Sequence, residues 1–105
     1  ESTIAAQIFG HTHRDEFKLF YDLNNKTRPI AVAYLGPSVT TETLLNPAYR
    51  VYTIDGDYVG SSYYILDFKT VYLNLTEANY NNATQWKDEY YVKKDLHLEN
   101  LFPDD

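Results

Sequence analysis

The apolar and aromatic residues of this chain fall into short segments, and this pattern restricts the fold more than any other feature of the sequence. Alternating or continuous apolar segments that end at turn-forming residues predict β-strands. Turn signals stand at Asn24-Asn25-Lys26, Gly36-Pro37-Ser38 and Asp55-Gly56-Asp57. The sequence therefore predicts a β-rich fold. The expected strands cover residues 4–9, 16–22, 29–35, 49–54, 63–68 and 71–75.

The first segment, residues 4–9, is a nearly continuous apolar run, which is typical of a strand buried on both faces in the middle of an α/β sheet. Residues 16–22 and 29–35 are expected to form an antiparallel hairpin. The connection over residues 36–47 is bracketed by prolines and is long for a simple connector, which favours a functional loop.

The character of the sequence changes after residue 75. Residues 76–79 indicate a capped helical turn, and a helix is expected near residues 85–95 with Trp86 and Tyr90 on one face. The fold class is therefore α/β for an intact sheet and α+β for these residues in isolation, with mostly antiparallel strands followed by a C-terminal helix.

Composition bounds the function classes. A chain of 105 residues holds at most one small domain, and its net charge of −6, without a basic cluster, argues against a nucleic-acid partner. No apolar run is long enough for a transmembrane segment, and the absence of Met and of a signal-like segment suggests that the chain starts inside a domain. The Asn-x-Ser/Thr sequons at Asn25, Asn74 and Asn82 point to a secretory-pathway glycoprotein.

Two of the three histidines, His11 and His13, stand one residue apart just after the first apolar segment. They would project to the same side of an extended backbone, at the edge where open α/β sheets bind ligands. Neutral imidazole suits zinc, so the pair is either a metal site or an ordinary polar loop. Of the adjacent Asp15 and Glu16, strand alternation turns only one inward, and we expect Asp15 to do so and to orient an imidazole. His97, near the tail, is expected to be an ordinary surface histidine.

Longer stretches sharpen this interpretation. GHTHRDEFKLFYD, RPIAVAYLGPSVTT, LNPAYRVYTIDG, GSS and YLNLTEAN resemble, in order and spacing, the acid sphingomyelinase family of calcineurin-like metallophosphoesterases. The resemblance covers essentially the whole chain. It implies that residues 1–76 are the C-terminal part of a metallophosphoesterase sandwich and that residues 77–105 begin a C-terminal helical region.

The resemblance also implies a chemistry. His11 and His13 would each bind one ion of a dinuclear zinc centre that hydrolyses sphingomyelin to ceramide and phosphocholine at a membrane surface, in a lysosomal or secreted setting. The family's other ligands, an Asp-x-His, a second Asp, an Asn-His and a further His, lie upstream and have no counterpart here. The site would thus be completed by the remainder of the parent catalytic domain. These residues alone would be inactive, with no catalytic residue beyond the metal ligands.

One departure concerns substrate preference. Glu42 stands where the family often has an aromatic residue, in the loop after PSVTT, and it would either face a choline cation or be a solvated loop carboxylate. Two other functions stay open: a phosphodiesterase of the same type acting on nucleotides, and a non-catalytic β-rich binding module that has lost the metals. The sequence upstream of this chain discriminates between an enzyme and a binding module.

Overall fold

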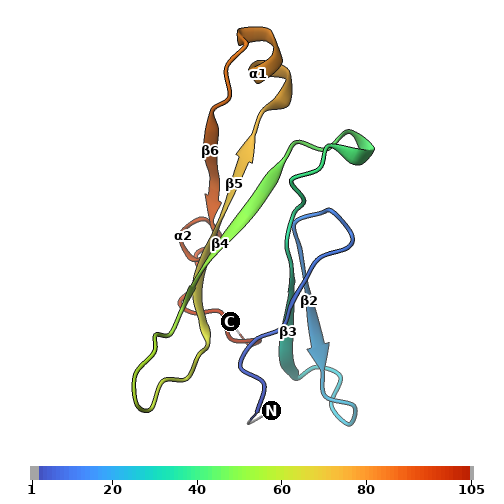
Figure 1. Cartoon of the computed structure of the whole chain (residues 1–105). Coiled ribbons are helices and arrows are strands. Elements are labelled where there is room, and N and C mark those ends of the chain that lie inside the picture. Colours follow the sequence, from blue (N-terminus) through green and yellow to red (C-terminus); the bar gives the residue numbers. More distant parts are fainter. Residues whose placement is uncertain (1–2, 105) are drawn as a thin grey trace.

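The computed structural model describes residues 3–104 and folds them into two three-stranded sheets (Figure 1). The expected units 1–76 and 77–105 reach, at their outer ends, beyond the described residues. The N-terminal sheet has the order β1-β3-β2 and the C-terminal sheet the order β4-β5-β6. The strands are β1 (Ile8–Phe9), β2 (Glu16–Tyr21), β3 (Pro29–Leu35), β4 (Ala48–Ile54), β5 (Ile65–Leu73) and β6 (Trp86–Tyr91). The helices are α1 (Leu75–Asn81) and α2 (Val92–Leu96), with a short 3-10 turn, η1 (Glu42–Leu44). The predicted α+β class with mostly antiparallel strands is confirmed.

The N-terminal sheet contains the predicted hairpin. β2 and β3 pair antiparallel, and the Asp22 carboxylate closes the turn by accepting a hydrogen bond from the Asn24 amide at 2.8 Å. β1 pairs with β3 in parallel, as expected for a first strand followed by antiparallel ones. The prediction that residues 4–9 form a strand buried on both faces is wrong. β1 is a sheet-edge strand of two residues, and the side chains of Ile8 and Phe9 are 50% and 52% exposed.

The C-terminal sheet is organised around β5. We expected two strands that meet near Lys69 and Thr70, but β5 runs unbroken from Ile65 to Leu73 and pairs antiparallel with both β4 and β6. Neither Lys69 nor Thr70 is a turn-former, and Thr70 is β-branched and completely buried. A central strand satisfies its backbone groups on both sides, so no break is favoured there.

The expected helix near residues 85–95 is the largest correction. Its first part, Trp86–Tyr91, is strand β6, and only Val92–Leu96 is helical. Trp86 lies opposite Leu73 and packs its ring against that of Tyr49 with the centroids 5.2 Å apart. Aromatic residues favour strands, and the free edge of β5 supplies hydrogen-bond partners that outweigh the weak local helix preference.

Helix α1 follows β5 directly and carries its own caps. The Asn74 side chain accepts a hydrogen bond from the Glu77 amide at 3.1 Å, and Asn82 ends the helix in the left-handed region with φ 48°. The capped turn predicted at residues 76–79 is thus confirmed, within a slightly longer helix. Within residues 3–104, no helix combines the length and apolar character that a membrane crossing requires.

A small core joins the two sheets. Tyr34 of β3 is buried against Ile65 and Phe68 of β5 and Val92 of α2. Burial, reinforced by the neighbouring Tyr52, raises the pKa of Tyr34 to about 12, so its hydroxyl stays protonated at neutral pH. That hydroxyl donates a hydrogen bond to the Leu101 carbonyl at 3.1 Å and ties the C-terminal segment to the sheets.

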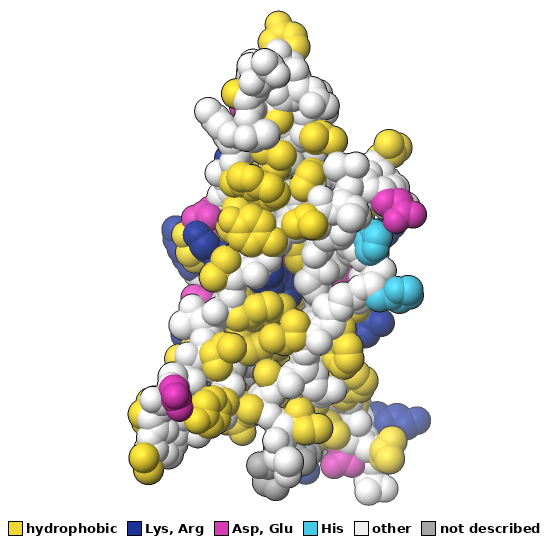
Figure 2. Space-filling model, in the orientation of Figure 1, with side chains coloured by type: hydrophobic (Ala, Val, Ile, Leu, Met, Phe, Trp, Pro, Cys, Tyr) yellow, Lys and Arg dark blue, Asp and Glu magenta, His cyan; other side chains and the backbone are white. Residues whose placement is uncertain are grey.

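The molecule is more open than a compact domain of its length. Its radius of gyration is 16.3 Å, against about 13 Å expected for 100 residues in a compact domain. Figure 2 shows hydrophobic side chains in a broad band over the visible face. On β2, Phe17 and Leu19 lie on one face of the strand and Phe20 on the other, and all three are exposed. Exposed apolar surface of this extent is unusual for a small soluble domain.

The cap of α1 provides a first testable prediction. Replacing Asn74 by Ala leaves the Glu77 amide without its acceptor and lowers the stability of α1 by about 1 kcal/mol, which is about a fivefold change in an equilibrium. Amide hydrogen exchange of residues 75–81 should accelerate by that factor. Asn74→Asp keeps an acceptor and should exchange like the parent. Thr76→Ala removes the same sequon but keeps the cap, so fast exchange in that variant would contradict the assignment to the cap.

Candidate metal-binding loop

The candidate site lies at the edge of the N-terminal sheet where β1 and β3 end. Because these two strands are parallel, the connections that leave them, residues 10–15 and 36–47, emerge at the same edge. The Gly36 amide donates to the Phe9 carbonyl at 2.9 Å, which fixes the starting points of the two connections side by side. Residues 10–15, the histidine loop, carry His11 and His13 to this edge. Histidine side chains gather at this edge of the molecule beside an acidic group (Figure 2).

The spacing argument assumed an extended backbone for His11 and His13. The backbone of the histidine loop is not extended. His11 and His13 adopt positive φ values of 85° and 63°. Such conformations cost non-glycine residues of the order of 1–3 kcal/mol each and concentrate at functional sites. Both histidines are accessible, with the His13 side chain 33% exposed. The loop therefore presents two imidazoles on strained backbone at an open edge.

His13 makes its contacts with the connection that follows β3. Its Nδ1 lies 3.5 Å from Thr40 Oγ1 and 3.8 Å from Glu42 Oε2. Glu42 begins the turn η1 and keeps 72% of its side chain exposed. The structure thus brings Glu42 and His13 together, as expected if this loop borders the site, and Nδ1 is the imidazole nitrogen turned to protein groups.

Asp15 closes the histidine loop by binding the other sheet. Its carboxylate forms an ion pair with Arg50 of β4 and accepts hydrogen bonds from Thr70 Oγ1 of β5 at 2.6 Å and from the Tyr90 hydroxyl of β6 at 2.8 Å. Asp15 does turn inward, with 24% of its side chain exposed, but its described partners belong to the C-terminal sheet and include no imidazole. The predicted orienting contact to a histidine is replaced by a contact between sheets.

Arg50 is the buried centre of this arrangement. Only 2% of its side chain is exposed, and its guanidinium lies 4.0 Å from the centroid of the Phe68 ring and donates to the Tyr52 hydroxyl at 3.2 Å. Its Nε is buried and finds no hydrogen-bond partner in the described part of the chain. A buried cation requires a counter-charge, and removing one partner of such a pair costs about 3–5 kcal/mol. We call these residues the inter-sheet cluster: Asp15, Arg50, Tyr52, Phe68, Thr70 and Tyr90.

The donor set suits zinc in kind but not in number. Imidazole is a common zinc ligand, and His11 and His13 are within reach of solvent. A structural zinc site has four ligands and a catalytic one three from the protein. In residues 3–104, no group of three or more His, Cys, Asp or Glu side chains is placed to hold a metal ion. Two imidazoles therefore match the kind of ligand that zinc binds, but they are too few to complete a zinc site.

The three sequons occupy different local settings. Asn25 is exposed in the β2–β3 turn, where its side chain accepts a hydrogen bond from the Thr27 hydroxyl at 2.7 Å. Asn82 is exposed at the C-terminal cap of α1, and Asn74 is half-buried as the N-terminal cap. His97 is likewise a cap residue, exposed at the end of α2 and in a different part of the fold from the histidine loop.

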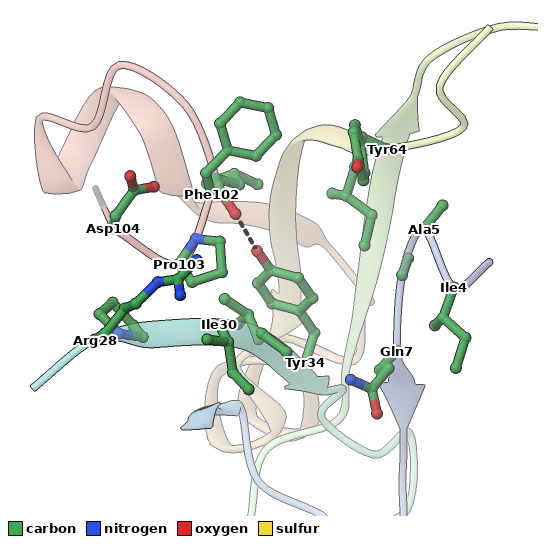
Figure 3. A pocket seen from close by; sticks show the side chains of 16 residues that line it. Ile4, Ala5, Gln7, Arg28, Ile30, Tyr34, Tyr64, Phe102, Pro103 and Asp104 are labelled. Carbon is green, nitrogen blue, oxygen red and sulfur yellow. Dashed lines mark hydrogen bonds between the residues drawn. The ribbon is translucent and has the colours of Figure 1, made fainter. Parts of the chain in front are cut away.

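A separate hollow of about 500 Å³ lies where the segment before β1, strand β3 and the C-terminal segment meet (Figure 3). Its lining is mainly apolar and includes Ile4, Ile30 and Phe102, with Arg28 at its rim; the Tyr34 hydroxyl reaches across it to Leu101 (Figure 3). Neither His11 nor His13 lines it. The hollow is therefore distinct from the candidate metal site.

The inter-sheet cluster is the part of the site region that the sequence did not reveal. The sequence leaves Arg50, like Arg14 and Arg28, open between a contact with phosphate or lipid and a paired or solvated surface position, with the surface position as the default. Arg50 is paired, but it is buried. A signal was present: strand alternation places Arg50 on the same face of β4 as Ala48, which is 7% exposed, so the inward face of this strand carries a charge.

Sequence comparison relates the chain to known proteins. A family model described as the acid sphingomyelin phosphodiesterase C-terminal region matches residues 28–105. The sphingomyelin phosphodiesterase of Homo sapiens is 53% identical over 104 residues, which is 98% of this chain and 16% of that protein. Sphingomyelin phosphodiesterase 2 of Caenorhabditis elegans is 41% identical over 105 residues, 98% of this chain and 17% of that protein. A cyclic GMP-AMP phosphodiesterase of Homo sapiens is 36% identical over 107 residues, 96% of this chain and 22% of that protein.

These matches rest on sequence identity over nearly the full chain. The chain belongs to the acid sphingomyelin phosphodiesterase family, and it corresponds to that family's C-terminal region. It spans 16% of the length of its Homo sapiens relative.

Proposed function

We propose that the intact protein containing this chain is a zinc-dependent phosphodiesterase that hydrolyses sphingomyelin to ceramide and phosphocholine. The single observation that carries this proposal is the 53% identity to a sphingomyelin phosphodiesterase across 98% of the chain. The model of the family's C-terminal region begins at residue 28, but the match to the sphingomyelin phosphodiesterase covers 98% of the chain and includes the edge of the sheet on which His11 and His13 lie. The proposal assigns the two histidines as the contribution of this chain to the active site.

His11 and His13 are proposed to bind one zinc ion each. Their positions on an open loop support this role, because both rings are accessible from the edge of the sheet. The Nδ1 of His13 faces Thr40 and Glu42, so Nε2 is the nitrogen proposed to face the metal. When bound, a pair of zinc ions supplies charge stabilisation at the phosphoryl oxygens and lowers the pKa of the water that attacks phosphorus.

The reaction also needs groups that this chain does not supply. Water adds to phosphorus while the bond from phosphorus to the ceramide oxygen breaks, and that oxygen leaves after accepting a proton. His97 is exposed at the end of α2 and has no described contact with the histidine loop, so it is not proposed as the proton donor. The remaining metal ligands and the acid are proposed to come from the rest of the parent catalytic domain, and the 105 residues alone to be inactive.

Glu42 is proposed to influence the choice of headgroup. It lies next to His13 yet keeps 72% of its side chain exposed, so its carboxylate is free to meet a ligand at the site. A choline headgroup carries a permanent positive charge, and a carboxylate nearby would favour it by Coulomb attraction. Thr43 and Leu44, which follow Glu42, also adopt positive φ values of 60° and 63°, so the backbone beside Glu42 is strained like that of the histidine loop.

Hydrolysis of nucleotide phosphodiesters is the second candidate. It rests on the 36% identity to a cyclic GMP-AMP phosphodiesterase of Homo sapiens over 96% of this chain. The higher identity to sphingomyelin phosphodiesterases of several species favours sphingomyelin. A non-catalytic binding module would instead lack the metal ligands of the remaining polypeptide.

Three variants of the intact protein test the proposed function side by side. His11→Ala and His13→Ala each remove one proposed ligand, so bound zinc and sphingomyelin turnover should both fall, with kcat reduced more than 100-fold (on the order of the 10²–10³ loss for one transition-state donor). Glu42→Gln should keep the zinc and reduce the preference for sphingomyelin over a phosphodiester with an uncharged headgroup. The zinc content is measured by atomic emission. Turnover is measured with sphingomyelin and with a cyclic dinucleotide as substrates.

The outcomes separate the candidates. Near-normal turnover in either histidine variant contradicts the proposed metal role. Faster turnover of the cyclic dinucleotide than of sphingomyelin by the unmodified protein favours the nucleotide candidate. A zinc-free, inactive parent favours the binding module.

A secreted or lysosomal location, with glycans on the sequons, is part of the same proposal. Asn25 and Asn82 are exposed, and the hydrogen bonds at Asn25 and Asn74 use the side-chain oxygen as acceptor, leaving the amide nitrogen for a glycan. The exposed apolar side chains of β2 are proposed to pack against the remainder of the parent domain.

Peptide mapping of the protein purified from its natural source tests the glycosylation proposal. Glycosidase treatment in heavy-oxygen water converts each glycosylated Asn to a labelled Asp, and label is expected at Asn25, Asn74 and Asn82. The half-buried Asn74 should show the lowest occupancy, since it is held as a helix cap. Complete absence of label at all three sites would contradict passage through the secretory pathway.

A further inference from the structure

We propose that Asp15 and Arg50 are positioning residues: their buried ion pair fixes the histidine loop against the C-terminal sheet and so sets where His11 and His13 meet the metals. This inference rests on the proposed function for the identity of the ligand. The contact between the loop and the sheet is a property of the described structure itself.

The Asp15 carboxylate is fully engaged in contacts with the C-terminal sheet. Both of its oxygens are occupied: Oδ1 by Arg50 and Tyr90, and Oδ2 by Thr70 and Tyr90. These partners come from β4, β5 and β6, one from each strand of the C-terminal sheet. Asp15 follows His13 by only two residues, so one carboxylate attaches the end of the histidine loop to an entire sheet.

The histidine loop is anchored at both ends. Where the loop begins, the Phe9 carbonyl accepts the Gly36 amide at 2.9 Å and holds β1 beside β3. At the other end Asp15 is held by the inter-sheet cluster. Between these anchors His11 and His13 adopt positive φ, a conformation that persists only when surrounding contacts impose it. Releasing one anchor lets the loop relax to ordinary backbone angles.

The position of the histidine loop depends on the C-terminal sheet, and not the reverse. Arg50 is 2% exposed and stacks on Phe68 in the interior of the C-terminal sheet, whereas the histidine loop is exposed. The buried element therefore imposes its position on the exposed one. Groups that orient metal ligands from behind typically change metal affinity 10–100-fold when they are removed.

Variants of the intact protein test this positioning role, with controls from the same sheets. Asp15→Asn and Arg50→Met remove the charge pair, and Arg50→Lys keeps the charge but not the two-pronged guanidinium. Asp88→Asn removes a carboxylate that pairs with Lys69 at 2.8 Å on the exposed side of the C-terminal sheet. Tyr34→Phe removes the hydrogen bond to Leu101 without touching the histidine loop.

Loop mobility is measured without metal and without activity. In chelator-treated protein, trypsin cleavage after Arg14 of the loop is compared with cleavage after Lys26 of the exposed β2–β3 turn, by mass spectrometry. Arg50→Met leaves both cleavage sequences intact and should raise the ratio of the two rates at least fivefold, about what one kcal/mol gives. Asp88→Asn and Tyr34→Phe should leave the ratio unchanged. An unchanged ratio in Arg50→Met overturns the proposal.

Zinc retention and kinetics complete the test. Asp15→Asn and Arg50→Met should lose zinc to a competing chelator about 10-fold more readily than the parent, with kcat lowered and KM little changed, and Arg50→Lys should recover part of the loss. If these variants only lower the melting temperature, as Tyr34→Phe is expected to do, and keep parental zinc affinity, the residues are structural and the inference fails. If the parent itself holds no zinc, while the cleavage ratio still rises in Arg50→Met, the proposed function fails and the anchoring of the loop stands.

Discussion

The Arg50 guanidinium lies in the interior between the two sheets, with its side chain 2% exposed, and the Asp15 carboxylate reaches it from the N-terminal sheet. A charge in this position is tolerated only because its partner and further hydrogen bonds compensate for lost hydration. Tyr90 and Thr70 donate to the same carboxylate, and Phe68 covers the guanidinium face. Replacing the pair by apolar residues can be neutral for stability, so its retention fits a role in geometry.

That geometry matters because the two sheets share little else. The buried core between them centres on Tyr34, and the radius of gyration of 16.3 Å reflects an open arrangement with much exposed apolar surface. Hydrophobic contact is non-directional and would not by itself fix the angle between the sheets. The inter-sheet cluster supplies direction, and the histidine loop ends at one of its members, Asp15. The position of the loop and the angle between the sheets therefore depend on the same contacts.

The sequence predicted what depends on neighbouring residues and missed what depends on distant ones. The β2–β3 hairpin and the capped turn of α1 follow from local turn and cap chemistry. The spacing of the two histidines drew attention to the loop, but the extended backbone assumed for them is not what the structure has. The strand character of Trp86–Tyr91 depends on the free edge of β5, which only the fold creates. Arg50 was misleading because on β4 the apolar Val51 is 46% exposed while the charged residue before it is buried.

A double-mutant cycle on Asp15 and Arg50 tests the central claim most directly. The free energy of opening of the histidine loop is read from amide hydrogen exchange of residues 10–21 in the parent, in Asp15→Asn, in Arg50→Met and in the double variant. If the pair holds the loop, each single variant loses most of the protection and the double variant loses little more, which gives a coupling of about 1–3 kcal/mol. Effects that add to within about 0.5 kcal/mol would show that the two residues act independently and would contradict the account.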